Sequence, residues 1–214
     1  MQLHEIKERN FLFTFAPDPS WNLNLHLIRG KQFDYIIDTG LGSLSVKPIL
    51  DLIKKDSKNI IVINTHYHWD HIWANHIFKN NIIISHTKCR DMMEAQWDYM
   101  IHKNEDYLQG KTIKTLPNLV FDNEINFPED HIRVFYTPGH TIDSISILDE
   151  EEKVLHAGDN IGDTLEEIIP SIDTDNITFK NTLIQYQGLD FDTCVSGHNQ
   201  ILPKDIIYTM LKKL

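Results

Sequence analysis

The segment HYHWDH, residues 66–71, carries four side chains that can bind a metal ion. Imidazole and carboxylate groups are the donors that zinc and related divalent metals accept in hydrolytic sites. His66 and His68 are two residues apart, so an extended backbone points both to one side. Asp70 and His71 then lie on the following turn and can reach a second position. This spacing indicates a metal site.

Three further candidate ligands occur later in the chain. His140 lies in TPGHT, Asp159 in HAGD and His198 in SGH, each directly after an apolar stretch typical of a strand. A single histidine at such a position is more often structural. However, α/β proteins gather site residues at the carboxyl ends of their strands, and here four strand ends carry ligand types. The expected ligands are therefore His66, His68, Asp70, His71, His140, Asp159 and His198.

The elements that must position these ligands alternate between strands and helices. Short apolar runs bounded by Gly, Pro or Asn predict strands, and apolar residues at spacings of three and four predict helices. Strands are expected at 11–15, 23–28, 33–38, 59–64, 81–85, 132–138, 144–149, 153–159 and 193–197; helices are expected around 46–53, from the ligand segment to about 78, at 174–187 and from about 203 to 214. This order predicts an α/β layered sandwich of two similar halves.

Residues 86–110 form an unusual helical segment, because Met and aromatic residues are mixed there with many charges. Two interpretations are open. The segment is a helical insertion or lid over a substrate pocket, since Met and aromatic side chains adapt to varied apolar ligands; or it is a plain surface helix with its apolar face on the core. Its exposed apolar residues are also compatible with a homodimer contact.

Size and composition favour one globular domain over residues 1–214, with 41% hydrophobic and 24% charged residues. The net charge of −11 disfavours a nucleic-acid partner, because such partners are bound through Lys and Arg. No apolar stretch approaches the roughly 20 residues of a membrane span, and the start lacks the features of an export signal. We therefore expect a cytoplasmic protein whose two cysteines, Cys89 and Cys194, are reduced and buried.

The motifs, in this order, resemble the metallo-β-lactamase superfamily: the HxHxDH run, then the TPGHT histidine, the HAGD aspartate and the SGH histidine. Asp38-Thr39-Gly40 also resembles an early aspartate element of that family, so the resemblance spans roughly residues 33–198. It implies an αββα sandwich with the metals at one edge, between the two sheets.

The resemblance also implies a role for each ligand. One metal is held by His66, His68 and His140, the second by Asp70, His71 and His198, and Asp159 bridges both. Asp38 would orient a ligand histidine through a hydrogen bond, a role that metal sites commonly need. Asp70 and Asp38 are therefore the candidate catalytic residues: Asp70, in addition to its role as a ligand, would accept or relay a proton.

Two such metals would make the protein a hydrolase, because metal coordination lowers the pKa of water from about 15.7 towards 7. The expected reaction is attack of a metal-bound hydroxide on a small-molecule ester, thioester, lactone or phosphodiester. Zinc suits the all-His/Asp ligand set best, although Fe and Mn accept the same groups. The alternative is a diiron oxidoreductase, similar to flavodiiron proteins or persulfide dioxygenases, on the same scaffold.

Differences between this sequence and the known branches of the family narrow the expected class of substrate. The best-known zinc β-lactamases have Cys at the position of Asp159, and flavodiiron proteins typically have Glu at the position of His68. The glyoxalase II branch has longer chains with a helical C-terminal domain that contacts the substrate. Only sixteen residues follow His198 in this sequence, so that domain is not expected here. The tRNase Z branch is disfavoured by the acidic charge.

Five further histidines are interpreted as lying outside the metal site. His76 is not spaced to share a helix face with His71, and His156 is expected to be buried and hydrogen-bonded within a strand. His86, His102 and His131 are expected at the surface.

Overall fold

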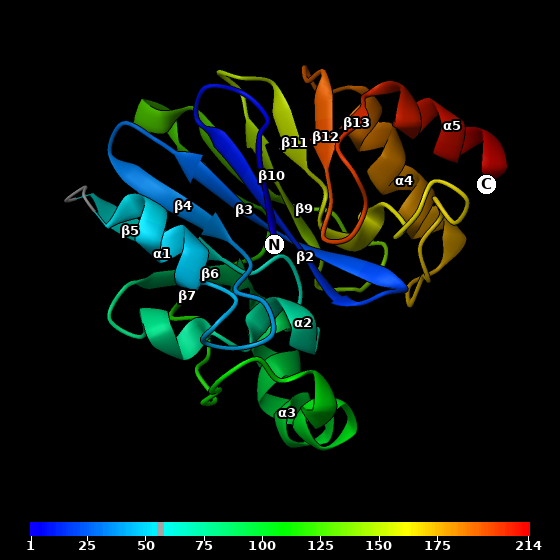
Figure 1. The fold of residues 1–214 in the computed structure, drawn as a ribbon. Helices are drawn as coiled ribbons and strands as arrows, with labels where there is room; N and C mark the ends of the chain where they lie inside the picture. The colour runs from blue at the N-terminus through cyan, green and yellow to red at the C-terminus, as the bar shows by residue number, and fades with distance from the viewer. Residues whose placement is uncertain (55–57) are drawn as a thin grey trace.

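In the computed structural model, which describes residues 1–54 and 58–214, two β-sheets pack face to face between helices (Figure 1). Within the described residues, one sheet has seven strands in chain order, β1 to β7, and the other has six in the order β13-β12-β11-β10-β9-β8. The αββα sandwich expected from the sequence is confirmed.

The first sheet is antiparallel from β1 to β4 and parallel from β4 to β7. Its strands are β1 (Gln2–Glu5), β2 (Asn10–Asp18), β3 (Trp21–Arg29), β4 (Phe33–Ile37), β5 (Asn59–Ile63), β6 (Ile82–His86) and β7 (Leu119–Phe121). The second sheet is antiparallel except for the pair β11 and β12. Its strands are β8 (Glu124–Phe127), β9 (Ile132–Tyr136), β10 (Ile145–Asp149), β11 (Val154–His156), β12 (Thr193–Val195) and β13 (Leu202–Pro203).

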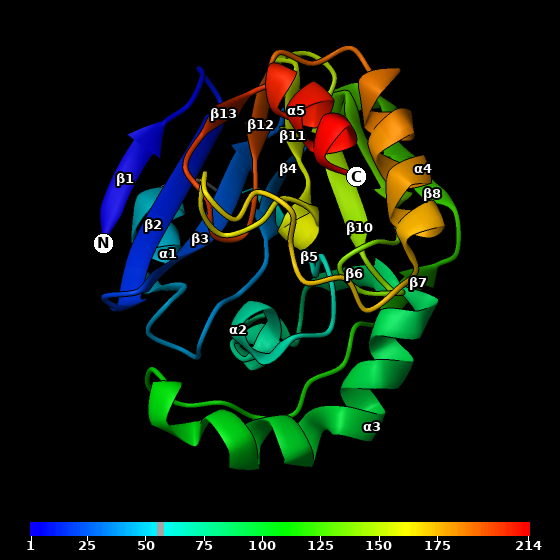
Figure 2. The ribbon, with the colours of Figure 1, turned by 90° about the vertical axis from the view of Figure 1, so that its right-hand side faces the viewer.

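Helices cover the outer face of each sheet and one edge of the sandwich. Both views place α2 and α3 at the same edge, with α4 and α5 on the side away from α1 (Figures 1 and 2). The α-helices are α1 (Lys47–Ile53), α2 (Trp69–Ile72), α3 (Thr87–Asn104), α4 (Asn176–Gln187) and α5 (Asp205–Lys213). Short 3₁₀ helices are η1 (Asn75–Phe78), η2 (Glu105–Tyr107), η3 (Pro128–Asp130) and η4 (Gly158–Asn160).

The period of two along each strand divides its side chains between two cores. In β4, Ile36 packs with α1 on the outer face of the first sheet, whereas Ile37 packs between the sheets. In β5, Val62 and Ile63 divide in the same way. This explains why both strands are apolar along most of their length: each is covered on two faces.

The single helix expected from the ligand segment to about residue 78 is wrong. α2 ends at Ile72, and only the 3₁₀ turn η1 follows. Tertiary contacts replace the helical hydrogen bonds: Trp73 N donates to Gly40 O (3.0 Å), and Thr112 Oγ1 donates to Trp73 O (2.7 Å). The short strands β1, β7, β8 and β13 were not predicted from the sequence, and every residue of β1 is exposed.

The helical part of the 86–110 segment is α3, whose apolar side is anchored. Cys89, Met93, Trp97 and Met100 are buried against the α2 region, which includes Trp73. The adjoining side of α3, which shares Met100 with the buried side, lines a pocket beside the ligand segment. Movement of α3 as a lid and a homodimer contact both stay predictions. No described helix, α3 included, is both long and apolar enough to cross a bilayer.

A largely buried ion pair ties the two sheets together at the end opposite α3. Arg9, directly before β2, donates from Nε to Asp149 Oδ2 at the end of β10 (2.9 Å), and its terminal nitrogen also contacts Asp149. Asn10 Nδ2 donates to the same Oδ2 (2.8 Å). The side chains of Arg9 and Asp149 are 11% and 0% exposed. Water therefore cannot fully solvate either charge if the ion pair is broken.

We expect Asp149→Asn to lower the free energy of unfolding by about 3 kcal/mol, because it leaves the largely buried Arg9 guanidinium with the more exposed Glu151 (3.1 Å) as its ion-pair partner in place of the buried Asp149. Denaturant unfolding measures this change. Glu124→Gln is the matched control, since Glu124 is 45% exposed in its pair with Arg133, and its cost should stay below about 1 kcal/mol. Equal effects in the two variants would contradict the role assigned to the Arg9–Asp149 pair.

Candidate metal centre

The structure brings all seven predicted ligand residues together at one edge of the sandwich. His66, His68, Asp70 and His71 follow β5, whereas one residue each follows β9, β11 and β12: His140, Asp159 and His198. The carboxyl ends of β11 and β12 meet because these strands are parallel neighbours. Parallel pairing of β4 with β5 likewise places Asp38 beside the loop that carries the first four ligands.

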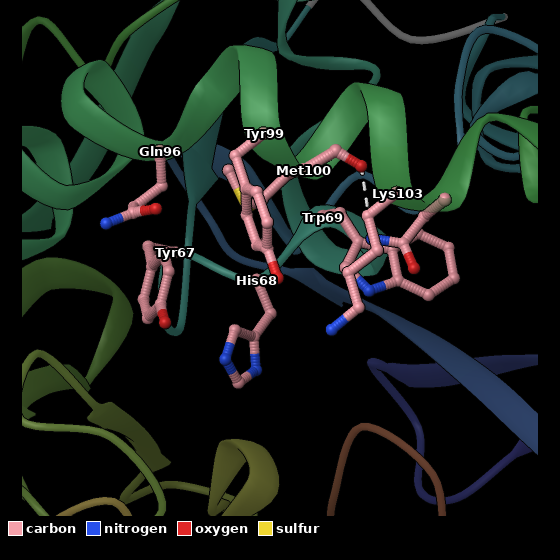
Figure 3. Close-up of a pocket in the computed structure, with 8 residues that line it drawn as sticks. Tyr67, His68, Trp69, Gln96, Tyr99, Met100 and Lys103 are labelled. Carbon is pink, nitrogen blue, oxygen red and sulfur yellow. Dashed lines mark hydrogen bonds between the residues drawn. The ribbon is translucent and has the colours of Figure 1, made fainter.

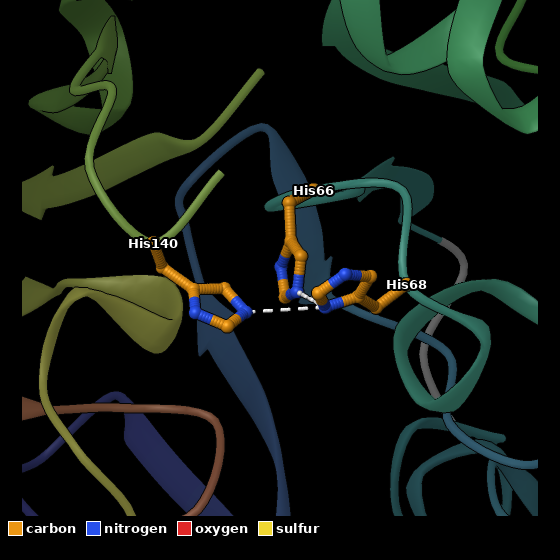
Figure 4. A group of neighbouring side chains, drawn as sticks. All are labelled: His66, His68 and His140. Carbon is orange, nitrogen blue, oxygen red and sulfur yellow. Dashed lines mark hydrogen bonds between the residues drawn. The ribbon is translucent and has the colours of Figure 1, made fainter. Parts of the chain in front are cut away.

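His66, His68 and His140 form the first group of donors. His68 Nδ1 lies 3.0 Å from His66 Nε2 and 3.1 Å from His140 Nε2. Figure 4 shows that the three rings enter from opposite sides, His140 from the loop between β9 and β10 and the other two from the loop after β5. Ring nitrogens that converge in this way cannot all satisfy one another, because a neutral imidazole has one donor and one acceptor nitrogen.

Asp70, His71 and His198 form the second group. Their side chains are buried, and Asp70 Oδ2 lies 3.5 Å from His71 Nε2 and 3.4 Å from His198 Nε2. The donor atoms of this group all lie within 4.8 Å of one another, as do those of the first group.

Asp159 lies between the two groups. Its Oδ2 atom is 3.1 Å from His198 Nε2, 3.2 Å from His71 Nε2 and 3.5 Å from His66 Nε2. His140 Nε2 is 3.8 Å from the same oxygen. A single carboxylate oxygen therefore faces histidines of both groups, which is the position required of a bridging ligand.

Hydrogen bonds on the far side of three rings set which nitrogen faces the centre. The Nδ1 atoms donate to acceptors of the chain: His71 to Asp38 Oδ2 (2.8 Å), His140 to Ser171 O (2.8 Å) and His198 to Asn22 O (2.6 Å). An imidazole that donates from Nδ1 presents an unprotonated Nε2 when it is neutral. These three rings are thus held in the tautomer that a metal ligand needs.

Thr65 extends the same control to His66. Its hydroxyl donates to Asp38 Oδ2 (2.7 Å) and lies 3.1 Å from His66 Nδ1. Since the hydroxyl proton points to the carboxylate, the Thr65 oxygen is left to accept from His66 Nδ1, which directs the His66 Nε2 lone pair into the centre. Thr65 was not singled out in the sequence, although it directly precedes the ligand segment.

Asn160 positions the loop of His140 and was also missed. Its Oδ1 accepts from His140 N (2.8 Å), while Nδ2 donates to Thr137 O (2.8 Å) and to the hydroxyl of Tyr186 (2.9 Å). Only its place next to Asp159 could have drawn attention to it, because all three partners are distant in sequence.

The electrostatics of the centre favour positive charge. Burial alone would lower the pKa of His71, but the carboxylates of Asp159, Asp70 and Asp38 raise it well above its ordinary value. Burial is likewise outweighed at His198, where Asp159 and Asp70 raise the pKa to about 9. His66 is different: burial, and then His71, lower its pKa well below the ordinary value.

The residues present fit a bound cation. Among the described residues, two buried atoms of the donor residues, His71 Nε2 and Asp159 Oδ1, have no hydrogen-bond partner. Such atoms are costly when buried unless something binds them. The donor set, imidazole nitrogens and carboxylate oxygens, is the one that borderline divalent metals accept.

The other histidines lie outside this cluster. His86 is buried rather than at the surface as predicted, because its Nδ1 accepts from Lys88 N at the start of α3 (3.1 Å) and its ring stacks on Tyr136. His156 is buried, as expected, and its Nδ1 accepts from Gly158 N (3.2 Å). His102 and His131 are exposed, and His76 lies in η1.

Solved structures with the same fold include metallo-β-lactamases. One from Pontibacter korlensis superposes with a TM-score of 0.76 at 16% identity, over 99% of this chain and 97% of its own. The enzyme FIM-1 from Pseudomonas aeruginosa, in its mono-zinc form, gives 0.76 at 14% identity, over 99% and 93%. At such low identity the similarity shows the fold.

The sequence model of the metallo-beta-lactamase superfamily matches residues 21–198, and the chain belongs to this superfamily. The acyl-coenzyme A thioesterase MBLAC2 of Bos taurus is 24% identical over 164 residues, which cover 65% of this chain but only 58% of that protein. The probable metallo-hydrolase MJ0296 of Methanocaldococcus jannaschii is 25% identical over 176 residues, covering 82% and 70%.

The side chains of two candidate ligands, Asp159 and His71, pack directly against the backbone of Gly197. A Cβ atom there would lie 2.2 Å from Asp159 Oδ1 and 2.7 Å from His71 Cε1. We expect Gly197→Ala to displace one of these side chains and to lower the free energy of unfolding of the metal-free protein by about 1–3 kcal/mol. Chemical denaturation of chelator-treated protein measures this change.

Gly188→Ala is the control, because a Cβ atom at Gly188 would meet only Gln185 O at 3.5 Å, and its effect on stability should be within about 1 kcal/mol. Wild-type stability in Gly197→Ala would show that the centre is not packed as tightly as the structure indicates.

Proposed function

We propose that the protein is a metal-dependent hydrolase of small carboxylic esters or thioesters, with two divalent metal ions, zinc by preference, at this centre. The observation that carries the proposal is the convergence of two complete donor groups on one carboxylate, with the donor atoms of each group within 4.8 Å of one another. The relatives named as a metallo-hydrolase and as an acyl-coenzyme A thioesterase support hydrolysis and the thioester class.

Each donor group would hold one ion. His66, His68 and His140 form one set and Asp70, His71 and His198 the other, with Asp159 between them. When bound, the ions supply an activated water nucleophile at neutral pH and polarise the substrate's carbonyl oxygen.

The chain's own residues orient the ligands and handle the proton. Asp38 and Thr65 fix the rings of His71 and His66, as described above. In the hydrolysis, the water oxygen bonds to the carbonyl carbon and the carbon–sulfur or carbon–oxygen bond breaks. Asp70 is proposed to accept the water's proton at its carboxylate and to pass it to the leaving sulfur or oxygen.

Neither cysteine is suited to act as a nucleophile. Cys89 and Cys194 are both buried, and burial raises the pKa of the Cys194 thiol to about 12. Since the thiolate is the reactive form, the cysteines leave nucleophilic attack to water.

Removal of a donor should remove metal and activity together. We expect His68→Ala and Asp159→Ala to lose bound metal and metal-dependent hydrolysis, because each takes away an inward-facing donor that the chain cannot replace. Elemental analysis of protein produced without metal bias, paired with a panel of ester, thioester, lactone and phosphodiester substrates, measures both. Asp163→Ala is the control, since Asp163 is exposed near η4 and outside the donor groups.

Three results would count against the proposal. Two metals retained in Asp159→Ala would contradict the bridging position of Asp159. Two irons with oxygen consumption would favour the diiron oxidoreductase. A panel without any metal-dependent turnover would indicate a ligand-binding protein rather than a hydrolase.

Asp38→Asn tests the positioning of His71 separately from loss of a ligand. The amide puts a donor or a weaker acceptor opposite His71 Nδ1 and Thr65, so we expect the affinity for zinc to fall about 10–100-fold while two ions still bind at saturation. Competition with a chromophoric chelator measures the affinity. Asp163→Asn should match wild type, and unchanged affinity in Asp38→Asn would remove Asp38 from the proposal.

A further inference from the structure

A pocket of about 190 Å³ adjoins the candidate metal centre and shares His68 with it. Its walls come from two segments that are distant in sequence: the ligand loop and the exposed side of α3 (Figure 3). The lining residues are Tyr67, His68, Trp69, Gln96, Tyr99, Met100, Lys103 and Asn104. Because His68 belongs to both the pocket and the first donor group, a molecule with its reacting bond at the centre can extend into this pocket.

The α3 wall is one stripe of the helix. Gln96, Tyr99, Met100 and Lys103 follow spacings of three and four residues, which place side chains on one side of a helix. Figure 3 shows the side chains of Gln96, Tyr99 and Lys103 projecting from α3 to the side where Tyr67 and His68 lie. The stripe therefore presents an aromatic ring, an amide and a cation to the same space.

Lys103 is the distinctive member of the stripe. Among the lining residues it alone carries a permanent positive charge, and none of them is a carboxylate. Within the part of the chain that the structure describes, no carboxylate forms an ion pair with Lys103, and its contact is with the Tyr99 ring, 5.6 Å from the centroid. Other lysines at the surface do pair with acids, as Lys47 does with Asp51 (2.7 Å).

An unpaired lysine in a chain of net charge −11, at the wall of an aromatic pocket, is complementary to an anion. We propose that the substrate carries a second, anionic group, a carboxylate or phosphate, and that Lys103 binds it while the ester or thioester lies at the metal centre. Tyr67 and Tyr99 cover the apolar part between the two ends. Lys103 is thus a specificity-determining residue, an assignment that rests on the proposed hydrolase function.

The test uses two matched pairs of substrates on the zinc-loaded protein. 4-Nitrophenyl pentanoate and the 4-nitrophenyl half-ester of glutaric acid differ by a terminal carboxylate. The butyryl thioesters of pantetheine and of 4′-phosphopantetheine differ by one phosphate group. We expect wild type to have the lower KM for the anionic member of at least one pair, and the pair that responds identifies the anion as carboxylate or phosphate.

Lys103→Gln should raise KM for that anionic member about tenfold, as expected for loss of a charge-assisted hydrogen bond. Its kcat and the KM of the neutral member should stay within about twofold, and Lys103→Arg should restore most of the preference. Lys111→Gln is the control, because Lys111 is an exposed lysine just beyond α3 and outside the pocket lining. Higher salt should reduce the preference in wild type but not in Lys103→Gln.

Failure of this inference is distinguishable from failure of the proposed function. Equal KM changes for the neutral and anionic members in Lys103→Gln would show a packing role and overturn the inference, while turnover itself upholds the hydrolase. If no substrate is turned over, calorimetric titration of metal-free protein with glutaranilic acid and its neutral analogue pentananilide still tests Lys103. Loss of a preference for the acid in Lys103→Gln supports the anion site, and absence of that preference in wild type overturns it.

Discussion

The buried carboxylate of Asp38 is the contact on which the candidate centre depends. It accepts from Thr65 N (2.8 Å), from Thr65 Oγ1 (2.7 Å) and from His71 Nδ1 (2.8 Å), and it is fully buried. A buried carboxylate without partners is strongly unfavourable, and all three of these partners belong to the ligand loop and its helix. Asp38 lies at φ 60°, a conformation that Asp tolerates better than most residues. The Asp38 charge is therefore stabilised only when the ligand loop is correctly placed against it.

The two histidines that follow strands of the second sheet, His140 and His198, are oriented without such a charged partner. His140 and His198 donate instead to the backbone carbonyls of Ser171 and Asn22. Asn22 lies in β3 of the first sheet, whereas His198 follows β12 of the second, so the bond that orients this ring also joins the two sheets at the site. Orientation of the ligands and packing of the sandwich are coupled, because a shift between the sheets would turn the His198 ring.

The ligand types and the strands before them could be predicted because both are local properties of the sequence. Strand periodicity and the turn after each strand are encoded within a few residues. The supporting contacts could not be predicted in this way. Asn22 is 176 residues from His198 in sequence, and α2 stops at Ile72 because Gly40 and Thr112 bind the backbone of Trp73. His86 was misplaced for the same reason, since its burial depends on Tyr136, which comes from the other sheet.

The buried and exposed residues of α3 have different roles in the proposed hydrolase. Met93, Trp97 and Met100 hold the helix through buried packing on the α2 region, and Met100 also lines the pocket, so buried contacts set the position of the pocket wall. Tyr99 is 60% exposed, and Lys103 is exposed as well; exchange of such residues costs little folding free energy. In the proposed hydrolase, the buried donors would select the reacting bond, and any change among them would disturb charge and packing together. A helix face that can differ without disturbing those donors would select the remainder of the substrate, as expected when a site is carried on a common fold.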